Sequence, residues 1–240
     1  MLQPELVREI VYSMQRKVSI PVTVKCRIGA DDLDTYEDLL KFIRCASKGG
    51  AKKFIIHSRK CLLNGLTTKQ NREIPPLQYE VVHRLINEFP ELRFVLNGGI
   101  QSFSQAKIHI NREGYLHNVD NLYYESLPPV HGVMIGRAAY SNPLMFCTAD
   151  SEFFGVRDPC LSRRDILSRY IDYCEWAQSD EGPRRIVKNK NQMVSTSVLL
   201  NSMRNIIHGI KNVNKFRLLL NDLYIGKRLF IAIYTFFVNI

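Results

Sequence analysis

Four short apolar runs alternate with three stretches of helical periodicity in the first 140 residues of the chain. The runs are rich in β-branched and aromatic residues, as strands are, and comprise Pro21–Cys26, Phe54–Ile56, Leu92–Leu96 and Gly132–Ile135. The stretches between them repeat apolar side chains at helical spacing over Asp34–Ser47, Pro76–Phe89 and Ser102–Ile110. Strands that alternate with helices pair in parallel, so the pattern predicts an α/β protein with the order β-α-β-α-β-α-β.

Helical patterns flank this alternating region on both sides. An amphipathic helix is expected at the N-terminus, with a face formed by Leu6, Ile10, Val11 and Met14. Beyond residue 141 the patterns are helical only, in Ser162–Trp176, Val194–Gly209 and Asn214–Leu223. Basic clusters at 183–185 and 188–190 link the first two of these helices. We therefore expect an α/β domain over residues 1–150 and a small all-helical domain over residues 151–240.

Two segments do not fit the alternating pattern. Asn111–Val130 separates the third helix from the fourth strand, where a connection of about 2–6 residues is usual, and is interpreted as an insertion. Leu229–Ile240 is apolar, but it is shorter than the roughly 20 residues that a membrane-spanning helix needs. We therefore predict no membrane role for this terminal run.

The charge of the chain favours a polyanionic partner. Lys and Arg number 33 against 23 Asp and Glu, which gives a formal charge of +10 and a pI near 9.4. Such an excess is typical of proteins that bind nucleic acid, although a basic helical surface can also be merely solvated. The six cysteines are scattered without a CxxC pair, so free thiols in a reducing compartment are expected rather than disulfides or a zinc site.

The ends of the four predicted strands carry residues suited to binding a phosphate group. Parallel strands open at one edge, where glycine backbone amides can approach an anion and an arginine adds a forked charge. The candidate side chains and glycines are Lys25, His57, Asn97, Gly98, Gly99, Gly136 and Arg137. They predict a cofactor phosphate site, against the alternative of core strands that end in solvated loops. Because four βα units are visible where a (β/α)8 TIM barrel has eight, we interpret the α/β part as the C-terminal half of such a barrel.

Five motifs resemble those of the tRNA-dihydrouridine synthases. They are PVTVKCRIG (Pro21–Gly29), FIIHSRK (Phe54–Lys60), GLTTKQNREIPPL (Gly65–Leu77), LNGGIQS (Leu96–Ser102) and GVMIGRAAYSNP (Gly132–Pro143). The resemblance is good from Pro21 to Pro143 and extends more weakly to Asp222. Lys69 and Arg72, followed by EIPPL, are similar to the subgroup that acts on D-loop uridines 20 and 20a.

This resemblance implies an FMN-dependent enzyme that reduces uridine in tRNA to dihydrouridine with NADPH, in the cytoplasm or an organelle. It implies that FMN is lined by Lys25, His57, Asn97, Gly98, Gly99, Gly136 and Arg137. It also implies tRNA contacts from Lys69, Arg72 and Arg217, although Asn214 stands where a second basic residue of the helical domain is expected. No metal is implied, and the oligomeric state is left open.

The chain departs from this family in the part that carries its proton donor. The family cysteine lies in a motif resembling NxGCP, which these 240 residues do not contain, so no catalytic residue is predicted and Cys26 and Cys61 are not assigned that role. A flavin-contacting loop and glutamine are missing too, and an N-terminally truncated product is expected. Two alternatives remain at this point: a catalytically inactive tRNA-binding fragment, and a different phosphate-binding barrel that acts on a small metabolite.

Overall fold

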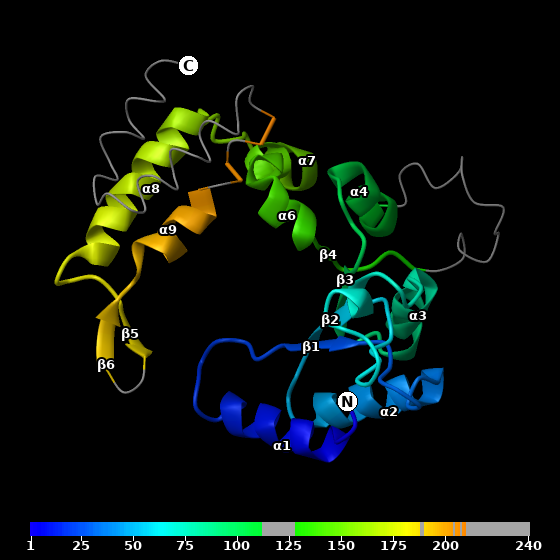
Figure 1. Cartoon of the computed structure of the whole chain (residues 1–240). Coiled ribbons are helices and arrows are strands. Elements are labelled where there is room, and N and C mark those ends of the chain that lie inside the picture. The colour runs from blue at the N-terminus through cyan, green and yellow to red at the C-terminus, as the bar shows by residue number, and fades with distance from the viewer. Residues whose placement is uncertain (112–127, 188–189, 204, 207, 210–240) are drawn as a thin grey trace. The chain divides into compact units, whose positions relative to one another are not determined.

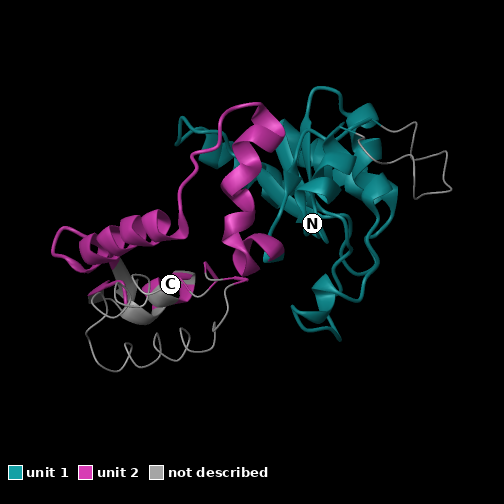
Figure 2. Cartoon of the chain, turned by 90° about the horizontal axis from the view of Figure 1, so that it is seen from above, with its two compact units in different colours: residues 1–137 teal, residues 138–240 magenta. Residues whose placement is uncertain are grey.

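The computed structural model describes residues 1–111, 128–187, 190–203, 205–206 and 208–209. The chain divides into two compact units, residues 1–137 and 138–240, which are described separately below (Figure 2). A domain boundary at residue 150 stays a prediction.

The first unit contains a parallel sheet of four strands in the order β1-β2-β3-β4 (Figure 1). The strands are β1 (Val24–Arg27), β2 (Lys53–His57), β3 (Arg93–Asn97) and β4 (Val133–Met134). Their sequential order and parallel pairing confirm the predicted α/β class. Closure of these strands into a barrel stays a prediction.

Four helices accompany this sheet: α1 (Pro4–Gln15), α2 (Tyr36–Lys48), α3 (Tyr79–Glu88) and α4 (Phe103–Asn111). A capping box fixes the start of α2, since the Thr35 hydroxyl accepts the Asp38 amide and the Asp38 carboxylate accepts the Thr35 amide. Helix α3 begins later than the predicted Pro76. The backbone of Gln78 is not helical, with φ −128° and ψ 77°, and its amide donates to the Ser58 carbonyl at 2.8 Å, so the helix begins only after it.

The core of the first unit lies on the face of the sheet that α3 covers. Phe54 and Phe94 are fully buried there with ring centroids 5.9 Å apart, and Phe89 at the end of α3 lies 6.3 Å from Phe94. Burying each aromatic side chain contributes about 1.5–3 kcal/mol. Because side chains alternate along a strand, the opposite face of the sheet carries Lys25 and Arg27 of β1 and Ile55 and His57 of β2.

The second unit combines helices with a β-hairpin. Its elements after α6 (Arg137–Ser141) are η3 (Pro143–Thr148), α7 (Ala149–Phe154), α8 (Arg163–Gln178), β5 (Arg184–Val187), β6 (Lys190–Met193) and α9 (Thr196–Met203). Strands β5 and β6 pair antiparallel, so the prediction of an all-helical domain is wrong. The segment read as a basic link includes Ile186 and Val187, whose β-branched side chains favour a strand.

The remaining predictions for this region have mixed outcomes. Helix α8 matches the predicted Ser162–Trp176, and Ser162 caps it through a bond with Asp165. Helix α9 lies within the predicted Val194–Gly209. The predicted helix Asn214–Leu223, the tail and most of the 111–130 insertion lie outside the described residues. Within the described part of the chain, no helix is long and apolar enough to cross a membrane.

Candidate functional site

The carboxyl edge of the sheet brings residues from three strands into one row. Arg27, His57 and Asn97 are the last residues of β1, β2 and β3, and the strand register pairs Arg27 with His57 and His57 with Asn97. Lys25 lies two residues before Arg27 and therefore on the same face of the sheet. The structure thus gathers the predicted Lys25, His57 and Asn97 at one edge, with Arg27 as a member that the sequence did not assign.

His57 is a neutral imidazole surrounded by cations. Burial lowers its pKa to about 4, and the charges of Arg27, Lys25, Arg59 and Arg137 act in the same direction. A histidine with this pKa is uncharged near neutral pH. The four cations therefore set a positive potential at the edge, which favours an anionic ligand.

Gly98 and Gly99 follow β3 in backbone conformations that favour glycine. Their φ angles are +118° and +71°. A Cβ at Gly98 would lie 2.8 Å from Cδ2 of His57, and a Cβ at Gly99 would lie 2.7 Å from Cδ1 of Leu77 and from the hydroxyl of Tyr79. Only glycine fits at these two positions, and without side chains the backbone amides can be approached closely by a ligand.

Hydrogen bonds fix the backbone on both sides of this glycine pair. The Tyr79 hydroxyl donates to the carbonyl of Gly98 at 2.8 Å. The Asn97 side chain donates to the Met134 carbonyl at 2.9 Å, and the backbone carbonyl of Asn97 accepts the Ser58 amide at 2.9 Å. The predicted Asn97 thus ties three neighbouring strand ends together.

Gly136 and Arg137 form the exposed end of the site. A Cβ at Gly136 would meet nothing within 4 Å. Nη1 of Arg137 lies 3.2 Å from the Glu73 carboxylate in an exposed ion pair, which is weak enough for a ligand anion to compete with it. Open space at Gly136, the glycine pair and the cations around His57 together fit a phosphate group.

Lys69 and Arg72 lie in the long loop between β2 and α3. Lys69 precedes the short 3₁₀ helix η1 (Gln70–Arg72), and both side chains are exposed. Residues three apart in a 3₁₀ helix point to the same side, so the two cations form one exposed pair. The third predicted tRNA contact, Arg217, lies outside the described residues.

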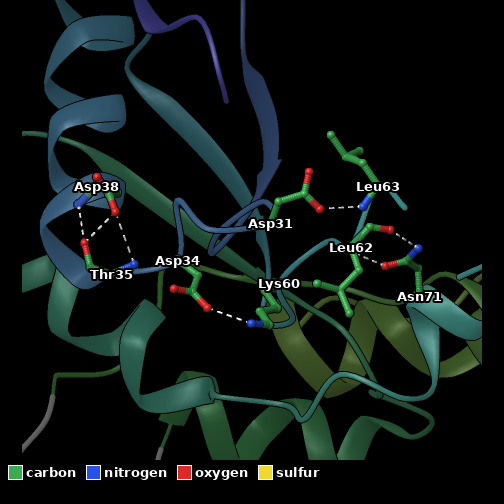
Figure 3. A network of polar contacts seen from close by, with 8 residues as sticks. All are labelled: Asp31, Asp34, Thr35, Asp38, Lys60, Leu62, Leu63 and Asn71. Carbon is green, nitrogen blue, oxygen red and sulfur yellow. Dashed lines mark hydrogen bonds and ion pairs between the residues drawn. The ribbon is translucent and has the colours of Figure 1, made fainter. Parts of the chain in front are cut away.

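Asn71, between these two cations, is buried and anchors the loop, a role that the sequence analysis missed. Its side chain accepts the Leu62 amide at 2.8 Å and donates to the Leu62 carbonyl at 2.7 Å (Figure 3). Arg59 fixes the end of the same loop by donating to the carbonyls of Glu73 and Pro75. No periodic signal marks such loop anchors, since their partners are backbone groups.

Two cysteines of the first unit lie near the strand ends in sequence, and the structure places them differently. Cys26 alternates with Lys25 and Arg27 along β1 and therefore lies on the opposite, helix-covered face. Cys61 follows β2, and its backbone bonds to Gly29 and Asp31. Among the described residues, no group of three or more His, Cys, Asp or Glu is placed to hold a metal ion.

Residues 1–223 match the family described as dihydrouridine synthase (Dus). A tRNA-dihydrouridine(20/20a) synthase of Vibrio cholerae is 42% identical over 72% of this chain and 48% of its own length. Proteins with the same description from Synechocystis and Escherichia coli are 41% and 46% identical over 73% and 71% of this chain and 47% of theirs. The chain spans about half the length of the curated relatives it matches. By the match over residues 1–223, this chain belongs to the dihydrouridine synthase family.

Proposed function

We propose that this chain serves in the reduction of uridine to 5,6-dihydrouridine in the D-loop of tRNA, with FMN as the prosthetic group and NADPH as the reductant. One observation carries the proposal: the strand ends bring His57, Asn97 and the glycine pair together within a ring of cations. This arrangement suits the phosphate of a flavin nucleotide. The relatives' names supply the tRNA substrate and the 20/20a positions.

The residues at the edge would divide the binding of FMN between them. Gly98 and Gly99 let backbone amides approach the phosphate, while Gly136 leaves space for it and Arg137 supplies a forked charge. Lys25, His57 and Asn97 would line the rest of the cofactor. A bound flavin supplies hydride chemistry toward the uracil double bond; the protein supplies orientation and electrostatics.

The exposed cations would hold the tRNA. Lys69 and Arg72 form a pair suited to backbone phosphates, and Arg217 is proposed as a third contact. Contacts of this kind release counterions, so affinity falls as salt rises. Taking the target uridine out of its stack costs a few kcal/mol, which contacts around the flipped base must return.

The proton donor of the reaction is not assigned to this chain. The family motif that would carry it is not among these 240 residues, and Cys26 lies on the wrong face of the sheet. The proposal therefore concerns the flavin-binding edge and the tRNA contacts. The reaction is placed in the compartment that holds tRNA and NADPH, which we take to be the cytoplasm.

A titration of the purified chain with FMN, followed by flavin fluorescence, tests this proposal. We expect saturable binding that inorganic phosphate weakens. Arg137→Gln should weaken FMN binding by about tenfold, since charge-assisted bonds to an anion are the strong ones. Arg93→Gln, at the opposite end of β3, serves as the control and should leave it unchanged.

Two results would contradict the proposal. One is a chain that folds but shows no saturable FMN binding. The other is a chain that does not bind an unmodified tRNA transcript at about 50 mM salt, or whose affinity for it does not change when the salt is raised to about 200 mM. The first outcome would contradict the proposed FMN binding, and the second would contradict the proposed tRNA binding. The two parts of the proposal are therefore tested separately.

A further inference from the structure

Arg27 links the edge of the sheet to the loop that carries the exposed cation pair. It is the last residue of β1 and lies in register with His57. Its Nη1 donates to two backbone carbonyls at 2.8 Å, those of Lys60 and Asn71. These carbonyls belong to opposite ends of one loop segment, so a single guanidinium closes that segment against the strand.

A buried side chain within the same loop segment also holds it in place. The buried side chain of Asn71 bonds to both backbone groups of Leu62 and to the carbonyl of Leu66 at 3.3 Å. Asn71 therefore contributes its carbonyl to Arg27 and its side chain to the start of the loop. Lys69 and Arg72, on either side of it, remain exposed.

A third set of contacts fixes the base of the loop to the turn after β1 (Figure 3). The Cys61 amide donates to Gly29 at 2.9 Å, and the Asp31 amide donates to Cys61 at 2.8 Å. The Asp31 carboxylate accepts the Leu63 amide at 2.7 Å. Asp31 has a φ of +48°, a conformation that a non-glycine residue keeps only where its surroundings hold it.

We propose that Arg27 is a positioning residue for tRNA binding, which holds Lys69 and Arg72 in place through the backbone of the loop. A cation on a fixed backbone loses less conformational freedom on binding a phosphate than one on a loose loop. Arg27 thereby couples the flavin-binding edge to the tRNA-binding loop without touching RNA. The inference rests on the proposed function, because it takes Lys69 and Arg72 to be tRNA contacts.

The substitution Arg27→Lys tests this role, because lysine keeps the charge near His57 but loses the forked donor group. With an unmodified tRNA transcript as probe, we expect the affinity of the 240-residue chain for tRNA to fall about five- to tenfold. The slope of log affinity against log salt should become shallower by up to about 2, as two phosphate contacts are lost. Arg93→Lys is the matched control and should change none of these values.

A double-mutant cycle separates positioning from direct contact. In a Lys69→Ala/Arg72→Ala background the cations are already gone, so adding Arg27→Lys should leave tRNA affinity nearly unchanged. If the loss is instead fully additive, Arg27 acts independently of the pair, and the inference is overturned. If Lys69→Ala/Arg72→Ala alone leaves tRNA binding intact, it is the proposed tRNA contact that fails.

Asn71→Ala tests the same loop without altering β1. It should reproduce the shallower salt slope with FMN binding retained, and hydrogen exchange should speed up at the amides of Leu62 and Leu63. This variant keeps the test decisive if Arg27→Lys does not fold. Faster exchange at these amides with unchanged tRNA affinity would overturn the inference, since the loop would then be loosened without consequence.

Discussion

The hydroxyl of Tyr79 donates a 2.8 Å hydrogen bond to the carbonyl of Gly98, so the first turn of α3 holds the peptide that follows β3. Burial raises the pKa of Tyr79 above its usual value, which keeps the phenol protonated and able to donate. The ring of the same tyrosine packs edge-on against His109, 4.6 Å between centroids. Tyr79 thus holds the Gly98 backbone of the proposed phosphate site in place.

Tyr79→Phe removes this hydrogen bond but keeps the ring. We expect the free energy of unfolding to drop by about 0.5–1.5 kcal/mol, which is the usual net contribution of one intramolecular hydrogen bond. FMN affinity should fall severalfold, because the Gly98 peptide loses its fixed orientation. Urea denaturation and an FMN titration measure the two effects. Tyr12→Phe, on an exposed residue of α1, is the control, and an equal loss there would contradict the argument.

Gly98→Ala is expected to damage both folding and cofactor binding. The φ of +118° strains any side-chain-bearing residue by about 1–3 kcal/mol, and the new Cβ would meet His57 at 2.8 Å. Gly65→Ala separates these causes, since Gly65 has a φ of +85° with nothing within 4 Å of its Cβ. Urea denaturation should show a smaller loss for Gly65→Ala, with FMN binding unchanged. Equal losses would mean that contact with His57 does not matter.

Gly136→Ala should affect binding but not folding. Its Cβ enters open space and its φ is not in the left-handed region, so the stability should change by less than about 0.5 kcal/mol. If phosphate approaches the backbone here, the added methyl group should weaken FMN affinity severalfold. Fluorescence titration measures this loss. Unchanged affinity would place the phosphate elsewhere along the edge.

The parts of this structure that the sequence predicted are those with a local signal. β-branched runs marked the strands, and period-3.6 patterns marked α2, α3 and α8. The hairpin β5–β6 was missed because charged and polar residues dominate the segment, and the two residues between its strands are not the Asn-Gly or Asp-Gly pair that usually marks a short hairpin. Arg27 could have been found, since it lies two residues after Lys25 on the same face of β1. Its carbonyl partners, Lys60 and Asn71, depend on the path of the loop and leave no pattern in the sequence.

The stability of the chain should fall as the pH drops from about 6.5 to about 4, partly because of His57. The unfolded histidine has a pKa of about 6.5, whereas burial and nearby cations hold the folded pKa at about 4. Between these values the unfolded state binds a proton that the folded state does not, so acid favours unfolding, and the full contribution is present only above about pH 6.5. Urea denaturation at about pH 7.5 and about pH 5 should show a smaller loss for His57→Gln than for the unaltered chain. Other histidines cancel in this difference, and equal losses in both proteins would mean that His57 is protonated in the fold.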